Sequence, residues 1–106
     1  MEVVICPSES AVGEVAAAKI AQVAQAVPGA PVLGVATGSS PLGVYRALAE
    51  LVAAGRLQLG EAHVFALDEY VGLPPGHPES YDEVIRRTVT EPLGLDSARV
   101  HVPNGF

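Results

Sequence analysis

The sequence predicts an α/β protein with an open, mainly parallel sheet and helices on both faces. Short apolar runs alternate with longer segments whose apolar residues recur at helical spacing, which is the order of parallel strands and crossover helices. Of the 106 residues, 49% are hydrophobic and only 5% are aromatic. This alanine- and valine-rich composition suits buried parallel strands covered by helices. The length indicates one small domain.

The first half of the chain predicts two strands and two helices. Residues 3–6 form an apolar run suited to an initial or edge strand, and residues 31–36 predict a buried strand. Ser8 or Ser10 is expected to cap a first helix that ends before Pro28. Its apolar positions are Val12, Val15, Ala16, Ile20, Val23 and Val27. The pair Ser40-Pro41 predicts an N-cap and first residue of a second helix, which Gly55 ends.

The second half continues the alternation. Residues 62–67 predict a third strand, which runs directly into Asp68-Glu69 and a loop rich in proline and glycine. Residues 79–91 predict a helix, and residues 99–102 a last strand. Such an order predicts a Rossmann-like three-layer arrangement, in which ligands bind beyond the carboxyl ends of the strands. The loops after Ala36 and after Leu67 are both expected at that edge.

The loop Thr37-Gly38-Ser39-Ser40 offers hydroxyls and a helix N-terminus, whose N–H groups and dipole attract anions such as phosphate. The alternative is an ordinary strand-to-helix turn in which Ser40 only caps the helix. At the next strand end, Asp68 or Glu69 could act as a general base after partial desolvation. The alternative there is a solvated acidic turn.

Charge and motifs exclude several functions. The net charge of −6 argues against nucleic acid as a partner, and no apolar run is long enough for a membrane span. The first residues lack the features of a signal peptide, so a cytoplasmic location is expected. His77 has no second ligand at metal-site spacing, and the sequence contains neither a Walker loop nor a dinucleotide fingerprint. No metal or other cofactor is predicted.

Three segments closely resemble the glucosamine-6-phosphate deaminase family: VLGVATGSSP (residues 32–41) with YRAL (45–48), LDEYVGLP (67–74) and HPESY (77–81). PNG (103–105) resembles the family's next landmark. The resemblance implies conversion of glucosamine 6-phosphate and water to fructose 6-phosphate and ammonia without a cofactor, and a homo-oligomer. Asp68 matches the catalytic carboxylate, which moves a proton from C2 to C1 of the open-chain sugar. Residues 37–40 match the phosphate loop, and Glu69 and Tyr81 are expected to contact substrate.

The resemblance also implies that something is missing. Family members are more than twice as long and carry further catalytic and phosphate-clamping residues downstream. Residues 1–106 are therefore expected to be the N-terminal portion of a sugar-phosphate isomerase/deaminase domain, with little activity alone. The alternatives are a 6-phosphogluconolactonase, which shares the fold and the phosphate loop, a non-catalytic sugar-phosphate-binding module, and a structural fragment without a ligand. The segment LDEYVGL favours the deaminase.

Overall fold

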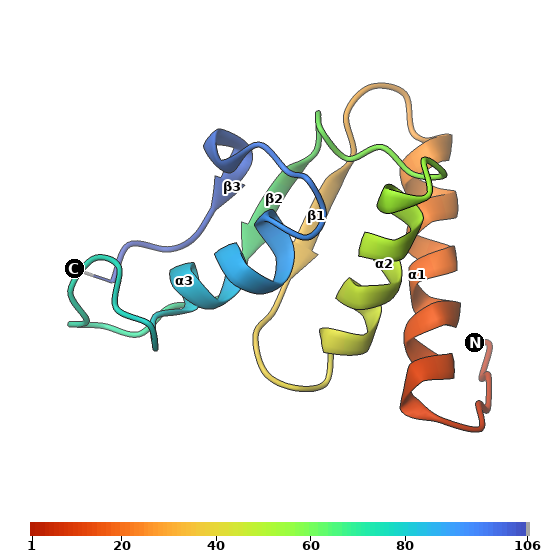
Figure 1. Cartoon of the computed structure of the whole chain (residues 1–106), viewed down its shortest axis with the longest axis horizontal. Coiled ribbons are helices and arrows are strands. Elements are labelled where there is room, and N and C mark those ends of the chain that lie inside the picture. Colours follow the sequence, from red (N-terminus) through yellow and green to blue (C-terminus); the bar gives the residue numbers. More distant parts are fainter. Residues whose placement is uncertain (106) are drawn as a thin grey trace.

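Three parallel strands form one open sheet with helices packed beside it (Figure 1). The computed structural model describes residues 1–105. The elements follow in the order α1 (Glu9–Ala26), β1 (Val32–Val35), α2 (Leu42–Ala53), β2 (His63–Ala66), α3 (Tyr81–Ile85) and β3 (Val100–His101). A π-helix, Arg86–Thr90, continues α3. The strands are arranged in the order β1-β2-β3. The predicted open parallel sheet is therefore confirmed.

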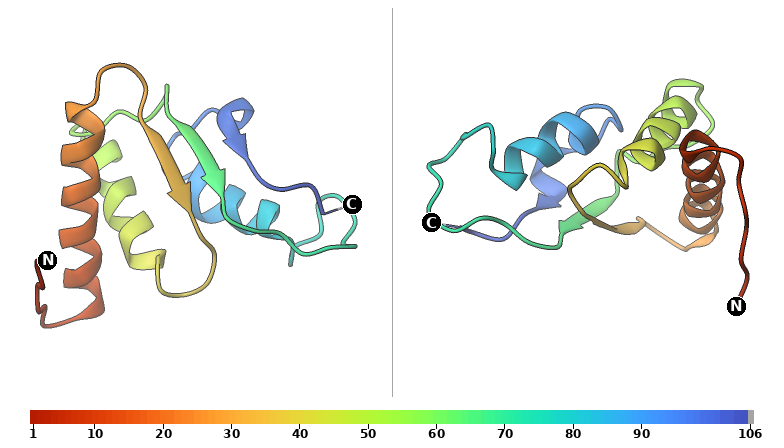
Figure 2. Two further views of the ribbon diagram at one scale, coloured as in Figure 1. Left: turned by 180° about the vertical axis from the view of Figure 1, so that it is seen from behind. Right: turned by 90° about the horizontal axis from the view of Figure 1, so that it is seen from below.

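Residues 3–6 do not form the predicted strand. They form no regular secondary structure, and Val3 and Ile5 are exposed. Figure 2 shows this segment beside the start of α1, on the side away from the sheet. A strand requires a neighbour that accepts and donates its backbone hydrogen bonds, and none of the described strands lies beside these residues. The predicted initial strand is therefore wrong.

Helix α1 buries a different face from the one that its valines predict. Ser8 caps the helix as expected, because its hydroxyl accepts a hydrogen bond from Ala11 N–H over 3.1 Å. The buried residues, however, are the small ones at helical spacing, Gly13, Ala17 and Ala21. The valines lie mostly on the exposed side: Val12, Val15, Val23 and Val27. The buried small residues let α1 pack closely on α2.

The closest approach of α1 and α2 is at Gly13 and Gly43. A Cβ atom added to Gly13 would lie 2.6 Å from both the carbonyl carbon and the carbonyl oxygen of Gly43. A Cβ atom added to Gly43 would meet only ordinary contacts, with Glu9 O at 3.6 Å as the nearest. Gly13 is therefore required by the packing of the two helices, whereas the Gly43 position has room for a methyl group.

The inner face of the sheet and the helices that cover it form the core. Val35 from β1 and Val64 from β2 are buried in this core, and α2 and α3 lie on one side of these strands (Figure 1). The buried apolar cluster consists of Ala17, Ala21, Val35, Tyr45, Ala47, Leu48, Leu57, Leu59, Ala62, Val64, Ile85, Val89 and Leu93. Burial of this apolar surface is the main favourable contribution to folding.

The outer face of the sheet remains exposed within residues 1–105. Val32 and Phe65 alternate with the buried strand residues and are 66% and 48% exposed. The imidazole of His101 stacks on Phe65, with 4.7 Å between ring centroids. The described helices thus lie on one side of the sheet (Figure 2), and the second helical layer that the fold class implies is not among the described residues.

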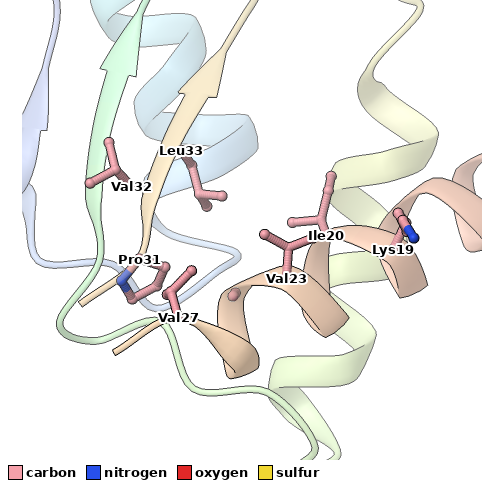
Figure 3. Close-up of a pocket in the computed structure, with 8 residues that line it drawn as sticks. Lys19, Ile20, Val23, Val27, Pro31, Val32 and Leu33 are labelled. Carbon is pink, nitrogen blue, oxygen red and sulfur yellow. The ribbon is translucent and has the colours of Figure 1, made fainter. Parts of the chain in front are cut away.

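An apolar groove separates α1 from the free edge of β1 (Figure 3). Its volume is about 220 Å³. Ile20, Val23 and Val27 line it from α1, and Pro31, Val32 and Leu33 line it from the chain that enters β1. Two of the four exposed valines, Val23 and Val27, therefore line this groove.

The last predicted helix is shorter than its apolar spacing suggests. The α-helical part ends at Ile85, and a π-helix follows to Thr90. Pro92 has no N–H and cannot donate to the Thr88 carbonyl, so the α-helical pattern cannot continue there. The hydroxyl of Thr88 also donates to the Val84 carbonyl over 2.7 Å, a local bond that perturbs helices. The proline and the threonine together account for the irregular end.

Candidate functional site

The two candidate loops leave neighbouring strands at the same edge of the sheet. β1 and β2 run parallel, with Val35 opposite Ala66. Beyond the paired residues, the Leu67 N–H donates to the Val35 carbonyl over 3.2 Å. The chain then enters the 37–41 loop from β1 and reaches Asp68 from β2. The predicted meeting of both loops at adjacent carboxyl ends is confirmed.

The phosphate-loop candidate, residues 37–40, leads into α2 without the predicted cap. Gly38 has φ of 98°, a conformation that favours glycine. Pro41, not Ser40, is the N-cap of α2, and no side chain caps the helix. The turn is instead closed by the Leu42 N–H, which donates to the Ser39 carbonyl over 3.3 Å. Ser39 and Ser40 are exposed, so capping does not account for their hydroxyls.

Tyr45 fixes the backbone immediately before this loop, a role that the sequence did not reveal. Its hydroxyl accepts a hydrogen bond from Ala36 N–H over 3.0 Å and donates one to Ala36 O over 2.6 Å. Burial raises the pKa of the Tyr45 phenol, and the bond from Ala36 partly offsets this effect. The only sequence signal was an apolar position on α2, which is equally consistent with simple core packing.

We expect Tyr45→Phe to lower the free energy of unfolding by about 1–3 kcal/mol, because the partly buried N–H and C=O of Ala36 would lose their partner while the ring would stay in place. Urea denaturation measures this loss, and amide hydrogen exchange should show reduced protection at Ala36. An unchanged unfolding midpoint with unchanged Ala36 protection would contradict the proposed role of the hydroxyl.

Asp68 lies at the end of β2 with its carboxylate exposed. Within residues 1–105 it has neither a hydrogen bond nor an ion pair. A carboxylate without a structural partner is available to take a proton from a ligand. The partial desolvation expected from its strand-end position is not provided by the described residues.

Glu69 is engaged very differently. One carboxylate oxygen, Oε1, accepts hydrogen bonds from the N–H groups of Tyr70 and Tyr81, each over 2.8 Å, and Oε2 accepts one from Asp82 N–H over 2.9 Å. Partial burial disfavours the charged form, but the three donors outweigh it and hold the pKa of Glu69 below its usual value. Glu69 therefore stays ionised and bound to the start of α3.

Tyr81 begins α3 and packs against Tyr70. The two ring centroids are 4.7 Å apart, with the rings tilted by 45°. A hydrogen bond between the two side chains raises the pKa of Tyr70. Glu69 and Tyr70 line a hollow of about 380 Å³, together with the loop at 73–76 and residues 102–105. The structure thus brings Glu69, Tyr70 and Tyr81 together after β2.

The phosphate-loop candidate lines a separate hollow. Ser39 and Ser40 face a space of about 620 Å³ that the first turns of α1 and α2 also border. Glu9, Glu14 and Glu50 line the same space with Arg46 as a single cation, and the excess of negative charge disfavours an anion there. The described part of the chain therefore places the serine loop and Glu69 at one sheet edge but in different hollows, and Asp68 lines neither of these two hollows.

Comparison with known proteins gives matches over nearly the whole chain. The family model described as glucosamine-6-phosphate isomerases/6-phosphogluconolactonase matches residues 7–105. The glucosamine-6-phosphate deaminase of Cutibacterium acnes is 55% identical over 106 residues, which is 100% of this chain and 40% of that protein. The deaminase of Streptomyces coelicolor is 52% identical over 105 residues, or 99% of this chain and 40% of that protein.

A solved structure shows the same fold. It is a monomeric glucosamine-6-phosphate deaminase described as the missing link of the NagB superfamily, with a TM-score of 0.91 and 31% identity to this chain. The match covers 99% of this chain and 43% of that one, so the chain spans about two fifths of the length of these relatives. That relative is described as monomeric, so the family does not settle the oligomeric state. The homo-oligomer expected for this chain stays a prediction. The chain belongs to the family of glucosamine-6-phosphate isomerases and 6-phosphogluconolactonases.

Proposed function

We propose that residues 1–106 form the N-terminal portion of a glucosamine-6-phosphate deaminase, which converts glucosamine 6-phosphate and water to fructose 6-phosphate and ammonia in the cytoplasm. The observation that carries the proposal is the free carboxylate of Asp68 at the same sheet edge as the uncapped start of α2. The identity of 55% to a deaminase supports it. In this function the chain would supply the base and part of the phosphate site.

Asp68 is the proposed base. In the open-chain sugar it takes the C2 proton as a double bond forms between C1 and C2, and the C1 carbonyl oxygen gains a proton from the substrate's own 2-ammonium group, which becomes a neutral amine. The protonated carboxyl then gives the proton to C1, which leaves an iminium at C2. Water adds to that carbon, and ammonia leaves as the ketone forms. One carboxyl group can act on both carbons because they are adjacent and it alternates between base and acid.

Residues 37–40 are the proposed phosphate contacts. Tyr81 is proposed to line the site of the sugar. The N-terminus of α2 and the hydroxyls of Ser39 and Ser40 can attract the phosphate. An exposed helix terminus contributes only about 0.3–1 kcal/mol to holding an anion. We therefore propose that the remaining contacts to the phosphate come from cationic residues equivalent to those in the part of the relatives that this chain does not cover.

The loss of the C2 proton tests this proposal, because it requires a working base and no later step. We expect proton NMR in D₂O to show exchange at C2 of glucosamine 6-phosphate by a chimera in which this chain replaces the matched segment of the Cutibacterium acnes deaminase. The 106-residue chain alone should exchange far more slowly. A folded chimera that does not exchange C2 but hydrolyses 6-phosphogluconolactone would indicate the lactonase instead.

A further inference from the structure

We propose that Glu69 is a positioning residue that holds the loop beside Asp68 by anchoring it to the first turn of α3, rather than a residue that contacts substrate. The inference rests on the proposed function of Asp68. It differs from the substrate contact that the sequence resemblance implies for Glu69. Its basis is the arrangement of backbone donors around one carboxylate.

Glu69 and Ser80 together occupy the free N–H groups at the start of α3. A helix leaves its first N–H groups without acceptors. Glu69 accepts from the first two, on Tyr81 and Asp82, and the Ser80 hydroxyl accepts from Glu83 N–H over 3.2 Å. The Val84 N–H then begins the helical pattern with the Ser80 carbonyl at 3.0 Å. The start of α3 therefore depends on a carboxylate 12 residues earlier in the chain.

A second contact holds the other side of the same segment. The Gly72 N–H donates to the Gly105 carbonyl over 2.7 Å. Gly105 is buried against the Tyr70 backbone, since a Cβ atom added to it would lie 2.0 Å from the Tyr70 carbonyl oxygen. The segment that follows Asp68 is thus fixed between α3 and the chain that leaves β3.

This anchoring determines the position of Asp68. The residue before it is tied to β1 through the bond from Leu67 N–H to Val35, and the residue after it is tied to α3. Asp68 has no hydrogen bond of its own among the described residues, so its direction is set by these two neighbours. A base held in this way stays free for the substrate and is still oriented.

The bonding of Glu69 also argues against a role as substrate ligand. A carboxylate offers about four acceptor positions, and three backbone donors already use both of its oxygens. A sugar hydroxyl that displaced one of them would leave an N–H at the start of α3 without its charged acceptor. Any contact with substrate beyond the one remaining acceptor position on Oε2 would therefore disrupt the structure that orients the base.

Two variants separate the effects of charge and position. Glu69→Gln keeps the side-chain length but only one accepting oxygen, and its NH₂ group would face an N–H. If the remaining oxygen stays with Tyr70 and Tyr81, Asp82 loses its acceptor. Glu79→Gln is the matched control, because Glu79 is an exposed acid in the same loop whose side chain has no hydrogen bond among the described residues.

The first measurement is amide hydrogen exchange by NMR on the 106-residue chain. Glu69→Gln should raise the exchange rate at Asp82 by about 10- to 100-fold, the range expected for a lost bond to a charged group, while Glu79→Gln leaves it unchanged. Equal protection of all three amides, those of Tyr70, Tyr81 and Asp82, in the Glu69→Gln variant and the parent chain would overturn the proposal.

The second measurement is C2 proton exchange by the chimera. Glu69→Gln should lower the maximal rate while the KM for glucosamine 6-phosphate stays constant, because the base is misplaced and the phosphate contacts remain. A raised KM with an unchanged maximal rate would overturn the proposal in favour of a substrate contact. If the parent chimera exchanges no C2 proton at all, the proposed function fails, and the amide result still decides whether Glu69 holds the loop.

Discussion

Asp68→Asn is expected to lower the rate of C2 proton exchange by the chimera by about 10²- to 10⁴-fold, the usual contribution of a positioned general base. Asparagine has nearly the same shape as aspartate but cannot take the proton. Because the Asp68 carboxylate is exposed and has no hydrogen bond within residues 1–105, the variant should keep the parent's unfolding midpoint. NMR of the substrate in D₂O and a urea titration of the protein measure the two effects.

Glu79→Gln serves as the control for the loss of one negative charge in the same loop. It should exchange the C2 proton at the parent rate, since Glu79 has no proposed contact with substrate. If Asp68→Asn exchanged as fast as Glu79→Gln, another group would have to be the base. If both were slow, the net charge of the loop rather than a specific carboxylate would control the rate.

Gly13→Ala is expected to lower the free energy of unfolding by about 1–3 kcal/mol, as overpacking does when the neighbours cannot move. The new methyl group would lie 2.6 Å from the backbone of Gly43, and a backbone atom in the first turn of α2 cannot turn away as a side chain can. In a domain of this size, each kcal/mol corresponds to a fall in the melting temperature of about 4–8 °C. Thermal unfolding followed by circular dichroism measures the shift.

Gly43→Ala provides the opposite expectation at the same helix contact. The added methyl would lie 3.6 Å from the nearest heavy atom, Glu9 O, and alanine is favoured over glycine inside a helix by about 1 kcal/mol. Gly43→Ala should therefore be neutral or stabilising. A loss of stability equal to that of Gly13→Ala would contradict the one-sided crowding that the geometry shows.

From residue 8 onward, the sequence predicted the order of elements well, because each signal for them was local. The cap at Ser8, the runs before Ala36 and Leu67, and the turns that end them depend on neighbouring residues only. The buried side of α1 was not predictable in this way. Its valines satisfy helical periodicity, but the approach of α2 at Gly13 selects the small residues instead, and hydrophobic spacing carries no information on which face another helix will occupy.

Within the candidate site, the sequence located both loops but did not assign every role. Ser40 before Pro41 is a common cap, yet the turn closes through a backbone bond from Leu42 and no side chain is needed. The family resemblance implied a substrate contact for Glu69, but it did not reveal the bonds that Glu69 makes to residues 12 and 13 positions away. Contacts at that separation depend on how the strand and the helix pack, which no short motif encodes.

The exposed outer face of the sheet makes the colloidal stability of this chain depend on its charge. At pH 7 the net charge of −6 keeps molecules apart, although Val32 and Phe65 present apolar surface to water. Repulsion disappears near the isoelectric point of about 4.8, and added salt screens it over about 10 Å at 0.1 M. Solutions of the chain should therefore cloud first in mildly acidic, salty buffers, where the attraction between uncovered sheets is no longer opposed.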